Sequence, residues 1–174
     1  GYSAEDIHAL GLTEVARIRS EMEAIIAEIG FEGSFAEFLA YLRSDPQFYA
    51  RSADELMAAA EEMSARLRAS LPDYFGRLPE LDFDVEPVPA SIAPGYTTGR
   101  YVSGDPEEGR KGIYLVNTYA LDQRPLYELP ALSAHEAVPG HHLQIALAQE
   151  MTGQPEFRKD YYATAFGEGW GLYA

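Results

Sequence analysis

The chain has 174 residues and carries 28 acidic against 13 basic side chains, which gives a net charge of −15. A nucleic acid or an anionic membrane surface would repel such a chain, so neither is an expected partner. The absence of cysteine excludes disulfides and thiolate metal sites. No apolar run approaches the ~20 residues that span a bilayer, and no signal peptide is recognisable. We therefore expect no membrane insertion of this chain, and a cytoplasmic and an exported location both stay open.

Helices are predicted for residues 1 to about 75. Thr13 has the character of an N-cap, and the helix that it would open continues to Gly30, which is placed to stop it. Apolar residues recur along this helix at helical spacing, so one face is expected in a core. These residues are Val15, Ile18, Met22, Ile25 and Ile29. The S-x-x-E pattern of a capping box begins at Ser34 and again at Ser52, which predicts two further helices.

Residues from about 81 to 118 are predicted to form a small antiparallel sheet. The stretches "LDFDVEPVP", "YTTGRYV" and "KGIYLVNT" are rich in β-branched and aromatic residues and are separated by turn-forming clusters. Pro87 and Pro89 exclude the first stretch from the middle of a sheet, because proline cannot donate a ladder hydrogen bond. The other two stretches would form a hairpin around an acidic loop. The expected fold class is α+β, mainly α, as a single domain or as a fragment of a larger protein.

Residues from about 119 to 174 are predicted to be helical again and to hold the chemistry. Three of the four histidines in the chain fall within "HEAVPGHH", from His135 to His142. The motif is similar to the HExxH helix of zinc hydrolases, except that Pro139 stands where the second histidine would lie. The spacing of the imidazoles therefore decides whether the motif can bind a metal.

An unbroken helix would keep these imidazoles apart. His141 would lie about 240° around the axis from His135, and His142 would lie ~10 Å along it. Neither could share a zinc ion with His135, because each nitrogen must come within ~2.1 Å of the metal. We therefore predict that the helix breaks at "VPG", where Pro139 cannot donate to the preceding turn and Gly140 tolerates unusual backbone angles.

Two residues are alternatives for the second ligand. Looping out two residues would bring His141 onto the face of His135, whereas looping out three would bring His142 there. His141 is favoured, since the smaller distortion leaves fewer backbone groups without partners. His142 would then orient a ligand or contact the substrate.

A third ligand is expected from the end of the chain. Two histidines leave a catalytic zinc one protein ligand short of the usual three. Glu168 lies in "YYATAFGEGWGLYA", whose aromatic residues indicate a buried helix. Burying a charged carboxylate costs roughly several kcal/mol unless the group is paired or coordinated. Coordination by the same metal would explain a buried Glu168 economically. The alternative is a surface acid on a frayed helix end.

Glu136 is the candidate general base. It follows His135 directly, so its carboxylate would lie beside the metal and could take a proton from water. A structural alternative exists, because Ser133 and Glu136 have the spacing of a capping box and a helix could begin there. The histidine cluster and Glu168 favour the catalytic interpretation.

These motifs carry a family resemblance. "HEAVPGHH" followed by "GEGWGLYA", with "GIYLVNT" upstream, resembles the bacterial family known as domain of unknown function 885, which is grouped with the zincin metallopeptidases. The resemblance implies that His135, His141 and Glu168 are zinc ligands and that Glu136 is the general base. It covers most of the chain. Members of that family are much longer than this chain.

The resemblance also has implications for substrate binding. In gluzincin relatives an antiparallel edge strand pairs with an extended peptide, and "GIYLVNT" would be that strand, with a pocket at Tyr114 or Asn117. Zincin sites usually draw an oxyanion-stabilising residue from farther along the chain. The candidates present are Tyr161, Tyr162 and Tyr173.

Three functions are compatible with these features. The leading hypothesis is a zinc-dependent metallopeptidase that cleaves a peptide or small amide. The second is a zinc esterase or amidase that acts on non-peptide substrates. The third is a non-catalytic helical binding domain. The chain stops at "GLYA" without a helix cap, so we expect a truncated chain that could hold metal without being an active enzyme.

Overall fold

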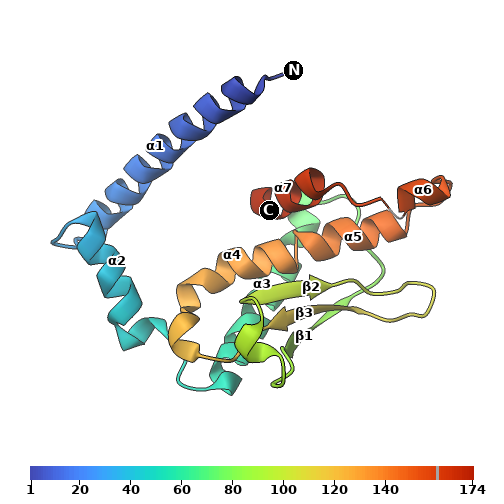
Figure 1. Cartoon of the computed structure of the whole chain (residues 1–174). Helices are drawn as coiled ribbons and strands as arrows, with labels where there is room; N and C mark the ends of the chain where they lie inside the picture. Colours follow the sequence, from blue (N-terminus) through green and yellow to red (C-terminus); the bar gives the residue numbers. More distant parts are fainter. Residues whose placement is uncertain (160) are drawn as a thin grey trace. The chain divides into compact units, whose positions relative to one another are not determined.

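The computed structural model describes residues 1–159 and 161–174 (Figure 1). Helices make up most of the described part and a three-stranded sheet accompanies them, which confirms the predicted α+β, mainly helical class. The chain divides into two compact units, Gly1–Pro46 and Gln47–Ala174. The third predicted helix therefore belongs with the sheet, in the second unit, and not with the two helices before it.

The first helix of the chain, α1 (Ala4–Glu28), begins earlier than predicted. Its N-cap is Ser3, whose hydroxyl accepts a hydrogen bond from the backbone N–H of Asp6 while the Asp6 carboxylate accepts from that of Ser3. This reciprocal pair satisfies two otherwise free N–H groups, so Thr13 lies inside the helix instead of capping it. The predicted end is confirmed, since Gly30 has a φ of 72° just beyond the helix.

The apolar stripe of α1 is exposed, contrary to the prediction that it faces a core. Val15 is 66% exposed and Ile25 is 57% exposed, whereas Ile26 is buried. Helical spacing shows which residues share a face, but burial also requires an element packed against that face. The neighbouring helix α2 (Phe35–Ser44), which begins at the predicted capping box, makes ring contacts with Phe31, a residue beyond the end of α1.

The second unit holds the sheet and the remaining helices. Their bounds are α3 (Ala53–Tyr74), β1 (Phe83–Pro87), β2 (Gly99–Val102), β3 (Gly112–Val116), α4 (Leu129–Glu136), α5 (His141–Gln149), α6 (Glu156–Lys159) and α7 (Thr164–Tyr173). In Figure 1, α4 and α5 follow one another along the sheet, and α7 lies on the far side of them.

The sheet has the order β1-β3-β2. The predicted hairpin of β2 and β3 is confirmed as an antiparallel pair, and β1 is an edge strand, as its prolines require. Two expectations were wrong: β1 pairs with β3 in parallel, so the sheet is mixed, and β3 is the central strand, not an edge strand. The parallel pairing is possible because β2 is inserted in sequence between β1 and β3, which provides the crossover connection.

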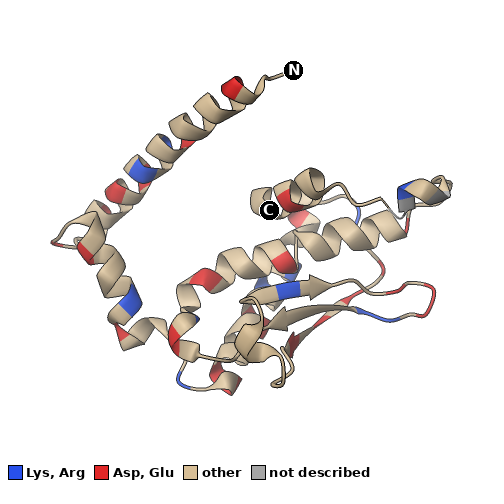
Figure 2. Cartoon of the chain, in the orientation of Figure 1, with Lys and Arg blue, Asp and Glu red and all other residues tan. Residues whose placement is uncertain are grey.

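The core lies where α3, α4 and α5 cover one face of the sheet. Alternate residues of β3, Tyr114 and Val116, point into it and meet Leu56 of α3, Leu129 of α4 and Leu143 of α5. This packing fixes both halves of the motif helix against the strands. No described helix is long and apolar enough to cross a membrane. In Figure 2, lysines and arginines are scattered among acidic residues in both units.

Candidate metal centre

The motif helix breaks where the sequence predicts. α4 ends at Glu136 and α5 begins at His141, and between them Ala137 has a ψ of −101° and Gly140 a ψ of −125°, both far from helical values. The break keeps its backbone groups bonded: the N–H of Gly140 donates to the carbonyl of Ala134 over 2.8 Å. A Cβ at Gly140 would collide with the carbonyl oxygens of Ala134 and His135, so this turn requires glycine.

α7 is anchored to the same break. The indole N–H of Trp170 donates to the carbonyl of Pro139 over 2.8 Å. Proline at this position contributes no N–H, but its carbonyl serves as the attachment point for another helix. The break therefore interrupts the motif helix and also provides the attachment point of α7, which carries Glu168.

Three helices bring one side chain each to a common point. The ligand atoms of His135 from α4, His141 from α5 and Glu168 from α7 all lie within 4.8 Å of one another. The Oε2 atom of Glu168 is 3.4 Å from Nε2 of His135 and 3.6 Å from Nε2 of His141. The two imidazoles stand nearly perpendicular, with an interplanar angle of 83°. The predicted ligand set is thus assembled, with His141 and not His142 as the second histidine.

These separations fit a metal ion better than hydrogen bonds. Both N···O distances exceed the range of roughly 2.7–3.2 Å that is typical of N–H···O hydrogen bonds. Donor atoms bound to one tetrahedral zinc at ~2.1 Å lie about 3.4 Å from each other, close to the two distances between Glu168 and the imidazoles. Two imidazoles and a carboxylate are also the donor set of catalytic zinc sites, which keep a fourth position for water or substrate. The residues present therefore fit a zinc ion.

Among the three candidate ligands, Glu168 is more exposed than predicted. His141 is buried, and its Nδ1 atom has no hydrogen-bond partner among the described residues, so packing and the contact with Glu168 hold the ring. The Glu168 side chain is 53% exposed, because the aromatic residues of α7 mostly face outward instead of enclosing it. Burial cost therefore does not explain this carboxylate. Its proximity to the two imidazoles is what makes it a candidate ligand.

Two glycines of "GEGWG" make the cluster possible, and the sequence interpretation did not identify them. A Cβ at Gly171 would lie 2.8 Å from Cε1 of His135, so the bare backbone leaves room for that imidazole. A Cβ at Gly167 would collide with the phenol of Tyr162, whose hydroxyl donates to Oε1 of Glu168 over 3.3 Å. Their spacing of four residues on a helix was the available signal, since it places both on one face.

We expect Gly171→Ala to weaken zinc binding by about tenfold, comparable to the loss of a residue that orients a metal ligand. The added methyl group would turn the His135 ring away from Glu168. Gly169→Ala is the matched control, because it makes the same change in the same helix with open space around the new Cβ. Zinc titration against a chelating indicator compares the two variants. Equal affinities would show that His135 does not depend on this space.

Glu136 lies at the last position of α4, and its carboxylate is held by the sheet. Its Oε2 atom accepts a hydrogen bond of 2.8 Å from the backbone N–H of Tyr101 on β2. The capping-box interpretation is wrong: α4 starts at Leu129, and Ser133 is a buried residue inside it whose hydroxyl donates to the Tyr114 hydroxyl at 3.4 Å. Glu136 therefore has no capping role and is available beside the cluster.

His142 lies away from the cluster, in the core. It is 2% exposed, and its Nδ1 atom shares a 3.0 Å hydrogen bond with the Tyr101 hydroxyl. Burial lowers the pKa of His142 to about 4 and raises the pKa of Tyr101 to about 12, so both groups are uncharged near neutral pH. The His142 ring contacts Phe83 and Tyr101 and so packs α5 against the sheet, whereas the prediction placed it at a ligand or at the substrate.

The two residues at which a substrate pocket was expected, Tyr114 and Asn117, lie in the interior of the second unit. Both residues are fully buried, and the Asn117 amide donates to three backbone carbonyls of the loop before β2. Alternate residues of β3 face the helices, which explains the burial of Tyr114, while Ile113 and Leu115 are half-buried on the other face. Tyr173 is 83% exposed at the end of α7, where its ring contacts Trp170. Among the three candidate tyrosines, Tyr162 is bonded to a residue of the cluster.

Comparison with known proteins identifies a family and solved structures that are similar to this chain. The family model "Bacterial protein of unknown function (DUF885)" matches residues 1–174. No curated protein matches the sequence. A solved structure of a Colwellia psychrerythraea protein described as a lipoprotein is similar, with 32% identity and a TM-score of 0.90. The similarity covers 99% of this chain and 30% of that one, so the chain spans less than a third of the relative. This chain belongs to the bacterial family of unknown function DUF885.

Proposed function

We propose that the chain carries the metal centre of a zinc-dependent hydrolase related to the zincin metallopeptidases. The observation that carries this proposal is the convergence of His135, His141 and Glu168 from three helices, with Glu136 next to the first of them. A cluster that served only to stabilise the fold would not need a broken helix, two glycines that leave room for neighbouring side chains, and a carboxylate next to His135.

The residues divide the chemistry between them. His135, His141 and Glu168 would hold zinc, which when bound polarises a carbonyl and lowers the pKa of water. Glu136 is held at one oxygen by the N–H of Tyr101, and the other oxygen would take a proton from the attacking water and pass it to the leaving amine. The fixed carboxylate spares the enzyme the cost of orienting its base in each cycle.

Tyr162 is the donor that we assign to the oxyanion. Its hydroxyl already lies at Glu168, 3.3 Å from Oε1. Partial burial, followed by the negative charges of Glu168 and Glu136, raises the pKa of Tyr162, so the phenol keeps its proton at neutral pH. A protonated phenol beside the ligands could stabilise charge that develops on a carbonyl oxygen.

A peptide substrate would pair with β2 and not with β3 as predicted, because β2 is the strand at the edge of the sheet. β2 pairs with β3 on one side, and the N–H of Tyr101 points out of the other side, toward Glu136. An extended peptide alongside this edge would lie next to the proposed base, and bonds to main-chain groups of β2 other than the Tyr101 N–H would position it with little dependence on its side chains. By analogy with the relative described as a lipoprotein, we also propose an exported location.

Zinc uptake tests the proposal. The protein, freed of metal and then supplied with zinc, is expected to retain about one ion per chain by elemental analysis, because the three ligands are already assembled. A protein that takes up no zinc at micromolar supply would contradict every hydrolase function and leave the helical binding domain. A peptide library and an ester panel, assayed on the full-length protein, then separate the peptidase from the esterase or amidase.

A further inference from the structure

We propose that Tyr101 and His142 act together as a positioning pair that holds the carboxylate of Glu136 in place. The inference rests on the proposed function, because it assigns Glu136 as the base. It adds two residues outside the candidate ligand set, and it concerns their side chains, whereas the proposed substrate pairing concerns the main chain of β2. Their effect would be on the orientation of the base and not on metal binding.

One residue of β2 bridges the two halves of the broken helix. The backbone N–H of Tyr101 donates to Glu136 at the end of α4, over 2.8 Å, while its hydroxyl bonds to His142 near the start of α5, over 3.0 Å. α4 and α5 are not continuous, so their relative position depends on contacts of this kind. Tyr101 is thus placed to fix the base against the helix that carries His141.

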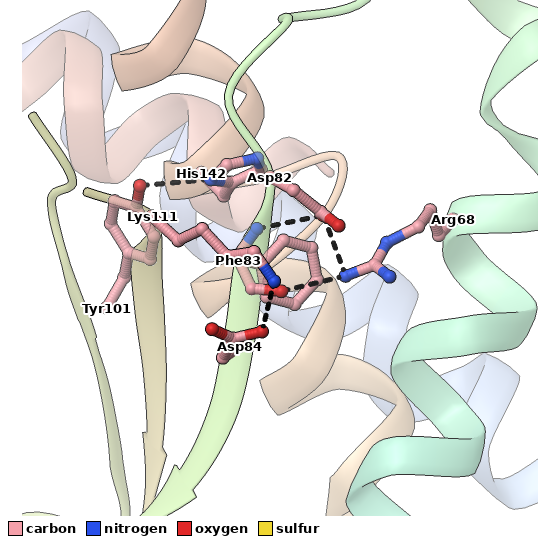
Figure 3. A network of polar contacts seen from close by, with 7 residues as sticks. All are labelled: Arg68, Asp82, Phe83, Asp84, Tyr101, Lys111 and His142. Carbon is pink, nitrogen blue, oxygen red and sulfur yellow. Dashed lines mark hydrogen bonds and ion pairs between the residues drawn. The ribbon is translucent and has the colours of Figure 1, made fainter. Parts of the chain in front are cut away.

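The pair is held rigidly from the other side as well. The His142 ring lies between Tyr101 and Phe83, with ring centroids 5.5 Å and 4.7 Å away (Figure 3). Arg68 of α3 lies over the Phe83 ring at 4.3 Å and donates to the Phe83 carbonyl at 3.1 Å. It also pairs with Asp82 at 3.1 Å. The imidazole therefore has little freedom to follow a displaced tyrosine.

The sheet leaves space for the Tyr101 ring. On β3, a Cβ at Gly112 would collide with the Tyr101 hydroxyl and ring, so the bare backbone there lets the phenol reach His142. The phenol also keeps a fixed direction, because β2 and β3 pair Tyr101 with Tyr114. Strand pairing sets the register of β2, but it does not set the distance between β2 and α4. That distance depends on contacts such as those of Tyr101.

Removing the hydroxyl tests the pair. Tyr101→Phe keeps the ring and its packing but loses the bond to His142. We expect zinc content to stay at the wild-type level, kcat to fall about tenfold and KM to change by less than about twofold, since a small misplacement of a catalytic group lowers the rate at unchanged binding. Tyr96→Phe, a half-buried tyrosine just before β2, is the matched control and should change neither constant.

Amide hydrogen exchange at residue 101 gives a readout that needs no activity. The N–H bonded to Glu136 should exchange about tenfold faster in Tyr101→Phe than in wild type or Tyr96→Phe, because the restrained geometry is lost. Unchanged exchange and unchanged kcat would overturn the positioning role, as would a kcat loss that merely follows a loss of zinc. A wild-type protein without zinc or hydrolysis would instead contradict the proposed function, while the exchange result would still decide whether the pair holds Glu136.

Discussion

Glu136→Gln is expected to abolish most hydrolysis while zinc binding remains intact. The amide cannot accept the proton of the attacking water, and loss of a general base typically lowers kcat by a factor of about 10² to 10⁴. The amide oxygen can still accept the hydrogen bond from the N–H of Tyr101, so the fold around the end of α4 should persist. The measurement is kcat on the best substrate from the peptide library, with zinc per chain determined on the same samples.

Glu128→Gln is the matched control for this variant. Glu128 lies exposed at the start of α4, so its substitution removes the same charge from the same helix without touching the cluster. Its kcat should equal that of the wild type. Hydrolysis that survives Glu136→Gln would remove Glu136 as the base, and a parallel loss of zinc would indicate that its carboxylate supports the metal instead.

His141→Ala and His142→Gln are expected to have opposite effects. Loss of His141 removes one of three ligands, so zinc affinity should fall by more than ~100-fold, beyond the loss seen when a residue behind a ligand is removed. His142→Gln should keep zinc, but it disturbs a buried hydrogen bond and ring contacts, and should destabilise the protein by about 1–3 kcal/mol. Competition with a chelator measures the first effect, and thermal unfolding measures the second.

The comparison decides between two neighbouring histidines that the motif alone presents as alternatives. If His142→Gln lost zinc and His141→Ala retained it, the shift at the helix break would be one residue longer in solution than in this structure. If both variants retained zinc, the cluster would not be a metal site. Circular dichroism of both variants controls for loss of helix.

Local features of the chain were predictable from the residues. The break at Pro139 and Gly140 followed from missing donors and backbone freedom, and the structure confirms it. The capping box at Ser34 was also confirmed, because a cap acts over a single helical turn. The three candidate ligands were predicted from residue chemistry and from the requirement that two imidazoles converge across one broken helix, with a carboxylate from a following helix.

The errors share one cause. The apolar stripe of α1 was assigned to a core because periodicity describes one element, not what covers it. β3 was placed at an edge because its residues do not show how many strands flank it. Glu168 was expected to be buried because aromatic neighbours in sequence were taken as neighbours in space.

The residues themselves determined where helices begin and break and which donor atoms are available, because these depend on interactions within a turn or two of the chain. The tertiary structure decided that β3 is central, that His141 enters the cluster while His142 enters the core, and that Tyr101 reaches Glu136. It also decided that Gly171 makes room for an imidazole from another helix. These contacts join residues distant in sequence, and their geometry is set by how α4, α5 and α7 pack around the strands.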